Sequence, residues 1–144
     1  MICKAAQTDV PAIVGLALQL WPGHSPEEFA EKFQTLVSQS NAAVFLALDN
    51  GAPIGFAQCQ LRHDYVEGTN SSPVGYLEGI FVTESHRRRG YAKLLLAACQ
   101  VWAKEKGCRE FASDCELVNE ESLRFHLKMG FEEANRIICF TKQL

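Results

Sequence analysis

A strand, a basic loop and a helix follow one another without a break between residues 74 and 107. The apolar stretch 74–82 (VGYLEGIFV) predicts a strand, the arginines of 87–89 follow it, and 91–106 has the pattern of a helix that ends at Gly107. The first turn of a helix carries unpaired N–H groups and the positive end of the helix dipole. Basic side chains at that end are unfavourable by themselves, so this cluster predicts a bound anion.

Small residues in the same turn indicate which anion fits. Gly90 and Ala92 allow a bulky anion to approach the backbone, and arginine side chains offer forked donors to phosphate oxygens. The alternative is a solvated charge run in front of an amphipathic helix. The phosphate hypothesis assigns the anion to Arg88, Arg89, Gly90, Tyr91, Ala92 and Lys93.

The remaining segments predict one α/β domain over residues 1–144. Strands are expected at 1–6, 43–48, 54–62 and 109–115, helices at 8–20, 25–37 and 119–129, and one or two short strands in an extended segment at 131–141. The order is β-α-α-β-β-β-α-β-α-β. Because β-α-β units force some parallel pairing, we expect a mixed sheet flanked by helices on both faces.

Composition excludes several classes of protein. The chain has 144 residues, of which 47% are hydrophobic, so it can bury a core, and no apolar run reaches the length of a membrane span. Its 14 basic and 17 acidic residues argue against a dedicated nucleic-acid binder. The six cysteines form no C-x-x-C pair and have no metal-ligand spacing with the histidines, so we expect reduced thiols, a cytoplasmic protein and no metal.

Two motifs resemble those of the GCN5-related N-acetyltransferases (GNAT). Arg87-x-x-Gly90-x-Ala92 resembles the R/Q-x-x-G-x-G/A signature, and 119–131 resembles the N-x-x-A-x-x-x-Y-x-x-x-G-F segment, with Ser122 and His126 in place of alanine and tyrosine. The resemblance implies that acetyl-CoA is the co-substrate and that its pyrophosphate lies on the signature loop. Its pantetheine arm would then contact Ile80, Phe81, Val82 and Asn119.

The segment Glu78-Gly79 interrupts the strand in front of this loop. A glycine inside a strand predicts a bulge or a close backbone approach. A bulge would free an N–H group that can polarise a thioester carbonyl and would splay the sheet to admit the cofactor. The alternative is a regular half-buried strand with Glu78 at its surface.

A narrower resemblance concerns the acceptor. The stretches 20–24, 62–68, 71–74, 77–82 and 108–114 resemble those of the aminoglycoside 6′-N-acetyltransferases, which confer antibiotic resistance. The resemblance implies that the aminoglycoside contacts Trp21, His24, Tyr65, Glu78 and Asp114. Asp114 ends a strand expected beside that of Glu78, and two carboxylates across one cleft would attract a polyamine. Related enzymes often carry an acid where this chain has Asn135.

These expectations combine into direct acetyl transfer in a ternary complex. Glu78 takes a proton from the 6′-ammonium, the amine attacks the thioester, and N–H groups near 80–82 hold the oxyanion. His126 stands where many relatives have a tyrosine that protonates the leaving thiolate. The resemblance also implies a homodimer, since related enzymes are commonly homodimers, and an exposed apolar end strand at 137–140 would suit an interface.

Three alternatives remain open at this point. The same fold could acetylate a protein N-terminus, a lysine or another small polyamine. It could bind acyl-CoA without catalysis. It could also bind nucleic acid through its arginines, and a salt-dependent affinity for DNA without acetyl transfer would favour that hypothesis.

Overall fold

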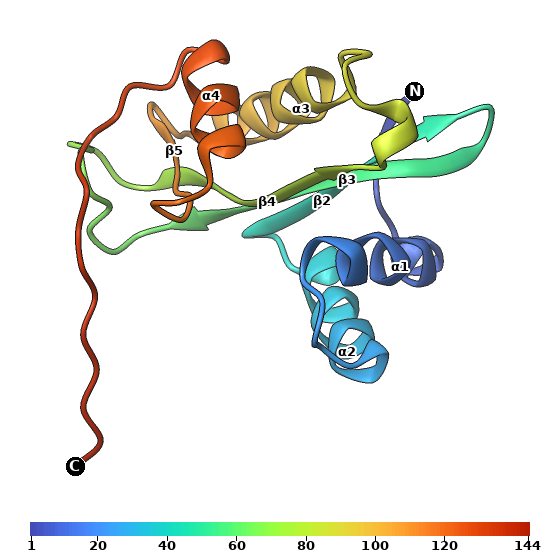
Figure 1. Cartoon of the computed structure of the whole chain (residues 1–144), viewed down its shortest axis with the longest axis horizontal. Helices are drawn as coiled ribbons and strands as arrows, with labels where there is room; N and C mark the ends of the chain where they lie inside the picture. The colour runs from blue at the N-terminus through green and yellow to red at the C-terminus, as the bar shows by residue number, and fades with distance from the viewer.

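The computed structural model describes residues 1–144 and contains a five-stranded sheet in the order β1-β2-β3-β4-β5 (Figure 1). The first four strands pair antiparallel, and β5 pairs parallel to β4. The sheet is therefore mixed, as predicted. The strands are β1 (Ile2–Lys4), β2 (Ala42–Asp49), β3 (Ala52–Arg62), β4 (Val74–Val82) and β5 (Phe111–Ser113).

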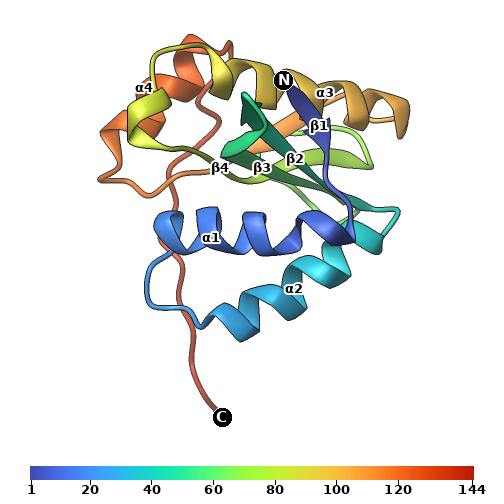
Figure 2. The same cartoon turned by 90° about the vertical axis from the view of Figure 1, so that its right-hand side faces the viewer.

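Helices cover both faces of this sheet. The pair α1 (Val10–Leu20) and α2 (Pro26–Ser38) lies on one face, and α3 (Tyr91–Glu105) and α4 (Glu120–Lys128) lie on the other, as Figures 1 and 2 show. Short 3₁₀ turns at Gln7–Asp9 and Glu84–His86 precede α1 and the loop to α3. No helix is both long and apolar enough to cross a lipid bilayer.

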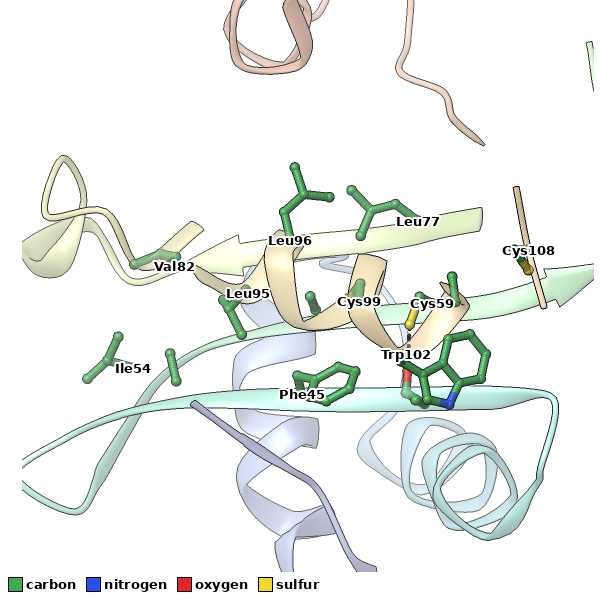
Figure 3. Packing of buried hydrophobic residues seen from close by; sticks show 14 residues of the cluster. Phe45, Ile54, Cys59, Leu77, Val82, Leu95, Leu96, Cys99, Trp102 and Cys108 are labelled. Atoms are coloured by element: carbon green, nitrogen blue, oxygen red, sulfur yellow. Dashed lines mark hydrogen bonds between the residues drawn. The ribbon is translucent and has the colours of Figure 1, made fainter. Parts of the chain in front are cut away.

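Each face of the sheet buries its own apolar cluster. In the first cluster, which we call the α3 cluster, the side chains of Leu95, Cys99 and Trp102 of α3 pack on Phe45 and on neighbouring strand residues (Figure 3). In the second, on the opposite face, Phe29 and Phe33 of α2 pack with Ile13 of α1 and with Phe56 of β3, and we call it the α1–α2 cluster. The two clusters fix β3 and β4 between two layers of helix, so the middle of the sheet is a rigid base for a site.

A β-bulge interrupts β4 at Glu78, as the sequence predicts. Gln58 of β3 pairs with Gly79 and the next residue, Cys59, pairs with Leu77, so Glu78 has no partner. The bulge also changes which face later residues take. Leu77 and Phe81 would share a face in a regular strand, but Leu77 packs in the α3 cluster and Phe81 against the α1–α2 cluster.

Strands β4 and β5 run together over only three residue pairs. Gly75, Tyr76 and Leu77 pair with residues 111–113, and β4 then continues to Val82 with no strand on that side. Phe111 and α3 approach Gly75 closely, since a Cβ there would lie 2.6 Å from both Ala103 and the Phe111 ring. The second half of β4 therefore keeps one open edge, as expected where a sheet admits a cofactor arm.

The prediction of a last strand within 131–141 is wrong for this chain. Phe131 packs with Phe111 and His126, and Ala134 lies against Gly68, but the segment forms no strand. The C-terminal end of the chain, red in Figure 1, extends away from the body of the molecule. Ile137, Ile138 and Phe140 are 67%, 80% and 88% exposed. The apolar pattern predicted one or two short strands, but within one chain this segment pairs with no strand of the sheet. We call 137–144 the C-terminal arm.

Candidate active site

The loop between β4 and α3 presents free backbone donors. Arg88 and Gly90 adopt left-handed conformations with φ of 63° and 85°. The first hydrogen bond of the helix joins Leu94 N to the Gly90 carbonyl (3.1 Å), and no side chain caps this end. The N–H groups of 91–93 lie ahead of that bond and are free for an anion.

The three arginines of this loop have different environments. Arg87 turns back to β4, where its Nε donates to the Val82 carbonyl (3.0 Å) and its guanidinium lies 5.7 Å from the Phe81 ring centre. Arg88 and Arg89 are exposed and make no ion pair. Arg87 therefore holds the loop, and its two neighbours are free to bind phosphate. This geometry fits the pyrophosphate of coenzyme A.

An acidic network lies at the bulge. Glu78 accepts three hydrogen bonds from Arg62, at 2.9–3.1 Å, and the Arg62 guanidinium lies 3.5 Å from the centre of the Tyr76 ring. The Tyr76 hydroxyl donates a short hydrogen bond to Asp114. Burial and this bond to Asp114 raise the pKa of Tyr76 far above its ordinary value, so the hydroxyl stays protonated. Arg62 and Tyr76 thus connect the two predicted carboxylates.

Trp21 borders the bulge from the end of α1. A Cβ at Gly79 would lie 2.5 Å from the Trp21 ring, so this ring packs directly on the strand backbone beside Glu78. Phe29 and Phe56 hold it edge-on, each with ring centres 6.0 Å away. His24 stacks on the ring of Phe29, with the two ring centres 4.7 Å apart. The structure therefore brings Trp21 to Gly79, the residue after Glu78, and it brings His24 only to Phe29, which packs against Trp21.

Tyr65 lies apart from this network. Its side chain is largely exposed, and its hydroxyl donates to Glu67 at 3.3 Å. The other oxygen of Glu67 accepts from Asn135 Nδ2 at 3.2 Å. A surface hollow of about 340 Å³ is lined by the 63–72 loop around Tyr65. No hydrogen bond or ring contact joins Tyr65 to Glu78 or Asp114 in the free chain.

Asn119 and His126 have structural partners on α4. The Asn119 Oδ1 accepts from Ser122 N at 3.1 Å, so this residue caps the helix and keeps its amide NH₂ free. His126 Nδ1 lies 2.7 Å from the Ser122 carbonyl, which can only accept, so the neutral ring carries its proton on Nδ1. Its Nε2 then accepts from the Ser113 hydroxyl at 2.8 Å. In this tautomer Nε2 has no proton to give.

Sequence reasoning missed the roles of Arg62 and Tyr76. The available signal was strand alternation, because Tyr76 and Glu78 are two residues apart on one strand and therefore share a face. The place of Arg62 depends on the pairing of β3 with β4, where it lies opposite Val74. That register is a long-range property that neither strand reveals alone.

Comparisons with known proteins agree with this architecture. The model of the acetyltransferase (GNAT) family matches residues 10–131. Aminoglycoside N(6′)-acetyltransferase type 1 of Salmonella typhimurium is 47% identical over 129 residues, which are 90% of this chain and 89% of that protein. The protein of the same name from Serratia marcescens is 39% identical over 100% of this chain and 99% of its own length.

Solved structures give the same result. AAC(6′)-Iy in complex with the bisubstrate analog CoA-S-monomethyl-acetylneamine superposes with a TM-score of 0.97 at 44% identity, covering 100% of this chain and 98% of that one. The apo structure of aminoglycoside 6′-N-acetyltransferase AAC(6′)-IG from Acinetobacter haemolyticus superposes with a TM-score of 0.95 at 35% identity. It covers 100% of this chain and 99% of that one. These matches confirm the predicted fold class and the predicted enzyme class, an acetyl-CoA-dependent N-acetyltransferase. The chain belongs to the GNAT acetyltransferase family and is closely related to the aminoglycoside N(6′)-acetyltransferases of type 1.

Proposed function

We propose that this enzyme transfers the acetyl group of acetyl-CoA to the 6′-amino group of aminoglycoside antibiotics and so confers resistance to them. The observation that carries the proposal is the arrangement along β4. An acidic network lies at the bulge at Glu78, and an uncapped, basic helix start follows the end of the same strand at Val82. The names and full-length similarity of the relatives support it.

The cofactor is assigned to the open edge of β4 and to the loop that follows. Acetyl-CoA would supply the activated thioester. Arg88, Arg89 and the N–H groups of residues 90–93 would hold its pyrophosphate, and the edge at residues 80–82 and the free amide of Asn119 would hold the pantetheine arm. We expect no metal to take part.

The acceptor is assigned to the face of β4 that carries the acidic network. Two carboxylates and one guanidinium leave one net negative charge there, because Tyr76 stays neutral. Arg62 offsets the charge of Glu78 but no cation offsets that of Asp114. We therefore assign Asp114 as the main ionic anchor, with Trp21, His24 and Tyr65 supplying ring surfaces to the sugars.

In the mechanism that we propose, the acetyl group is transferred directly at the bulge. Glu78 accepts a proton from the 6′-ammonium, directly or through one water, and the freed amine attacks the thioester carbonyl. Backbone N–H groups near residues 80–82 stabilise the charge that develops on that oxygen. Coenzyme A leaves as a thiolate, and His126 gives it no proton while its ring is in the tautomer described above.

Thiol release in the presence of a panel of acceptors tests this function. Aminoglycosides with a 6′-amine should release coenzyme A thiol, whereas otherwise similar drugs with a 6′-hydroxyl should not, because a hydroxyl is a much weaker nucleophile at neutral pH. Peptides with a free N-terminus or a lysine complete the panel. Equal rates with the 6′-amino and 6′-hydroxyl drugs would contradict the assigned position, and turnover of peptides alone would contradict the substrate class.

We further propose a homodimer held by the C-terminal arm. The arm exposes Ile137, Ile138 and Phe140, and the outer edge of β5 is unpaired within the chain. An extended apolar segment and a free strand edge are suited to pairing between two copies.

Deleting residues 137–144 should convert the dimer into a monomer, because it removes these exposed apolar side chains. Light scattering coupled to size exclusion measures the mass directly. The double substitution Ile138→Ser and Phe140→Ser keeps the length of the arm and should weaken association in the same direction. A wild-type chain that is monomeric at high concentration, or a truncated chain that stays dimeric, would contradict the role of the arm.

We place the reaction in the cytoplasm. All six cysteines are free, and Cys59 and Cys99 are buried side by side in the α3 cluster. Free thiols in this number are typical of a reducing compartment.

A further inference from the structure

Arg62 holds Glu78 by a fork of hydrogen bonds at the bulge. Its Nε and Nη2 donate to Oε1 at 3.1 and 2.9 Å, and Nη2 also donates to Oε2 at 3.1 Å. A carboxylate has roughly four acceptor positions, and three of those of Glu78 are taken. The remaining one is on Oε2. A forked guanidinium fixes the plane of a carboxylate as well as its position.

The ring of Tyr76 packs against the Arg62 guanidinium. The Arg62 Cζ lies 3.5 Å from the Tyr76 ring centre, and the ring is buried, with the residue only 6% exposed. The Tyr76 hydroxyl is itself tied to Asp114. Arg62 is therefore held on two sides, by a stacking contact and by ionic hydrogen bonds, and its side chain remains only 38% exposed.

We infer that Arg62 is a positioning residue, which orients Glu78 so that one acceptor position of Oε2 faces the incoming substrate amine. The inference rests on the proposed role of Glu78 as the base. A carboxylate at a bulge, without a strand partner, could otherwise rotate about its side-chain torsions. An error of about 1 Å in the place of a reacting group can cost on the order of 100-fold in rate.

The inference predicts a specific pattern of steady-state constants. Arg62→Lys keeps the positive charge but loses the planar fork and the stacking contact, so kcat should fall by about 10- to 100-fold with little change in the KM of the aminoglycoside. Arg62→Gln removes the charge as well. Its kcat should also fall, while its KM should decrease, because the site then holds two uncompensated carboxylates.

A double-mutant cycle with Glu78→Gln separates positioning from a general structural effect. If Arg62 acts through Glu78, Arg62→Lys should lower kcat in the wild-type enzyme and should have almost no effect in the Glu78→Gln enzyme. Arg124→Lys is the matched control, since Arg124 lies on α4 in a long, exposed pair with Glu120. It should leave kcat unchanged in both backgrounds. Thermal melting of every variant shows that each is folded.

The outcomes distinguish this inference from the proposed function. Normal turnover of 6′-amino drugs by Arg62→Lys would overturn the positioning role and leave the function intact. Equal loss of kcat in both backgrounds would also overturn it, because the effect would then not pass through Glu78. A wild-type enzyme that acetylates peptides but no aminoglycoside would overturn the proposed function and, with it, this inference.

Discussion

Glu78→Gln should lower kcat at pH 7 by about 10²- to 10⁴-fold, the range typical of general-base catalysis. Glutamine keeps the shape of the side chain but cannot accept the proton of the 6′-ammonium. The loss should be smaller at high pH, because a larger fraction of the substrate amine is then already deprotonated. Steady-state kinetics with one 6′-amino drug, measured from neutral to alkaline pH, checks both the size of the loss and its trend.

Asp114→Asn provides the contrast within the same network. Asp114 accepts from the Tyr76 hydroxyl and has no cationic partner, so its assigned role is to anchor the substrate. Its loss should raise the KM of the drug more than it lowers kcat. The two carboxylates differ in their partners, and this difference predicts different kinetic effects for two substitutions of the same chemical kind.

A folded Glu78→Gln enzyme with near-normal kcat at pH 7 would remove Glu78 as the base. The role would then pass to Asp114 or to a water held by backbone carbonyls. The same result would leave Arg62 with no catalytic group to orient. If Asp114→Asn lost mainly kcat instead, the roles of the two carboxylates would be exchanged.

Features that depend on neighbouring residues could be predicted from the sequence. The bulge at Glu78 follows from a glycine inside an apolar strand, and the open helix start at Gly90 follows from strand, glycine and helix in succession. Both are properties of a few consecutive residues, and local backbone preferences determine them. The signature motif Arg87-x-x-Gly90-x-Ala92 includes this helix start.

Features that depend on pairing between distant segments could not be predicted from the sequence. Arg62 reaches Glu78 only because β3 and β4 pair in one register and the bulge shifts it. The arginines at 87–89 are alike in sequence, yet Arg87 contacts the Val82 carbonyl and its neighbours do not. The apolar pattern of the C-terminal arm predicted a strand, but a strand must also lie against a partner edge, and where the arm lies relative to the sheet is not a property of the arm alone.

Gly90→Val should weaken the binding of acetyl-CoA by at least about 5- to 30-fold while leaving the fold intact. Gly90 has φ of 85°, and no atom lies within 4 Å of the position that a Cβ would take. The cost is therefore one of backbone conformation, about 1–2 kcal/mol for a residue with a side chain. A loop that populates its binding conformation less often loses affinity in the same proportion. The branched side chain adds a steric barrier where the pyrophosphate must approach the N–H groups of α3.

Gly107→Val is the matched control, because Gly107 has φ of 90°, is equally unobstructed and lies at the opposite end of the same helix. It should cost a similar free energy of unfolding, measured by denaturant titration, but leave the Kd of acetyl-CoA unchanged in calorimetry. Gly90→Ala should lie between wild type and Gly90→Val, since it carries the conformational cost with a smaller obstacle. Wild-type affinity in a folded Gly90→Val enzyme would exclude this helix start as the pyrophosphate site. A loss of affinity in Gly107→Val of equal size would show that stability, rather than the loop, controls binding.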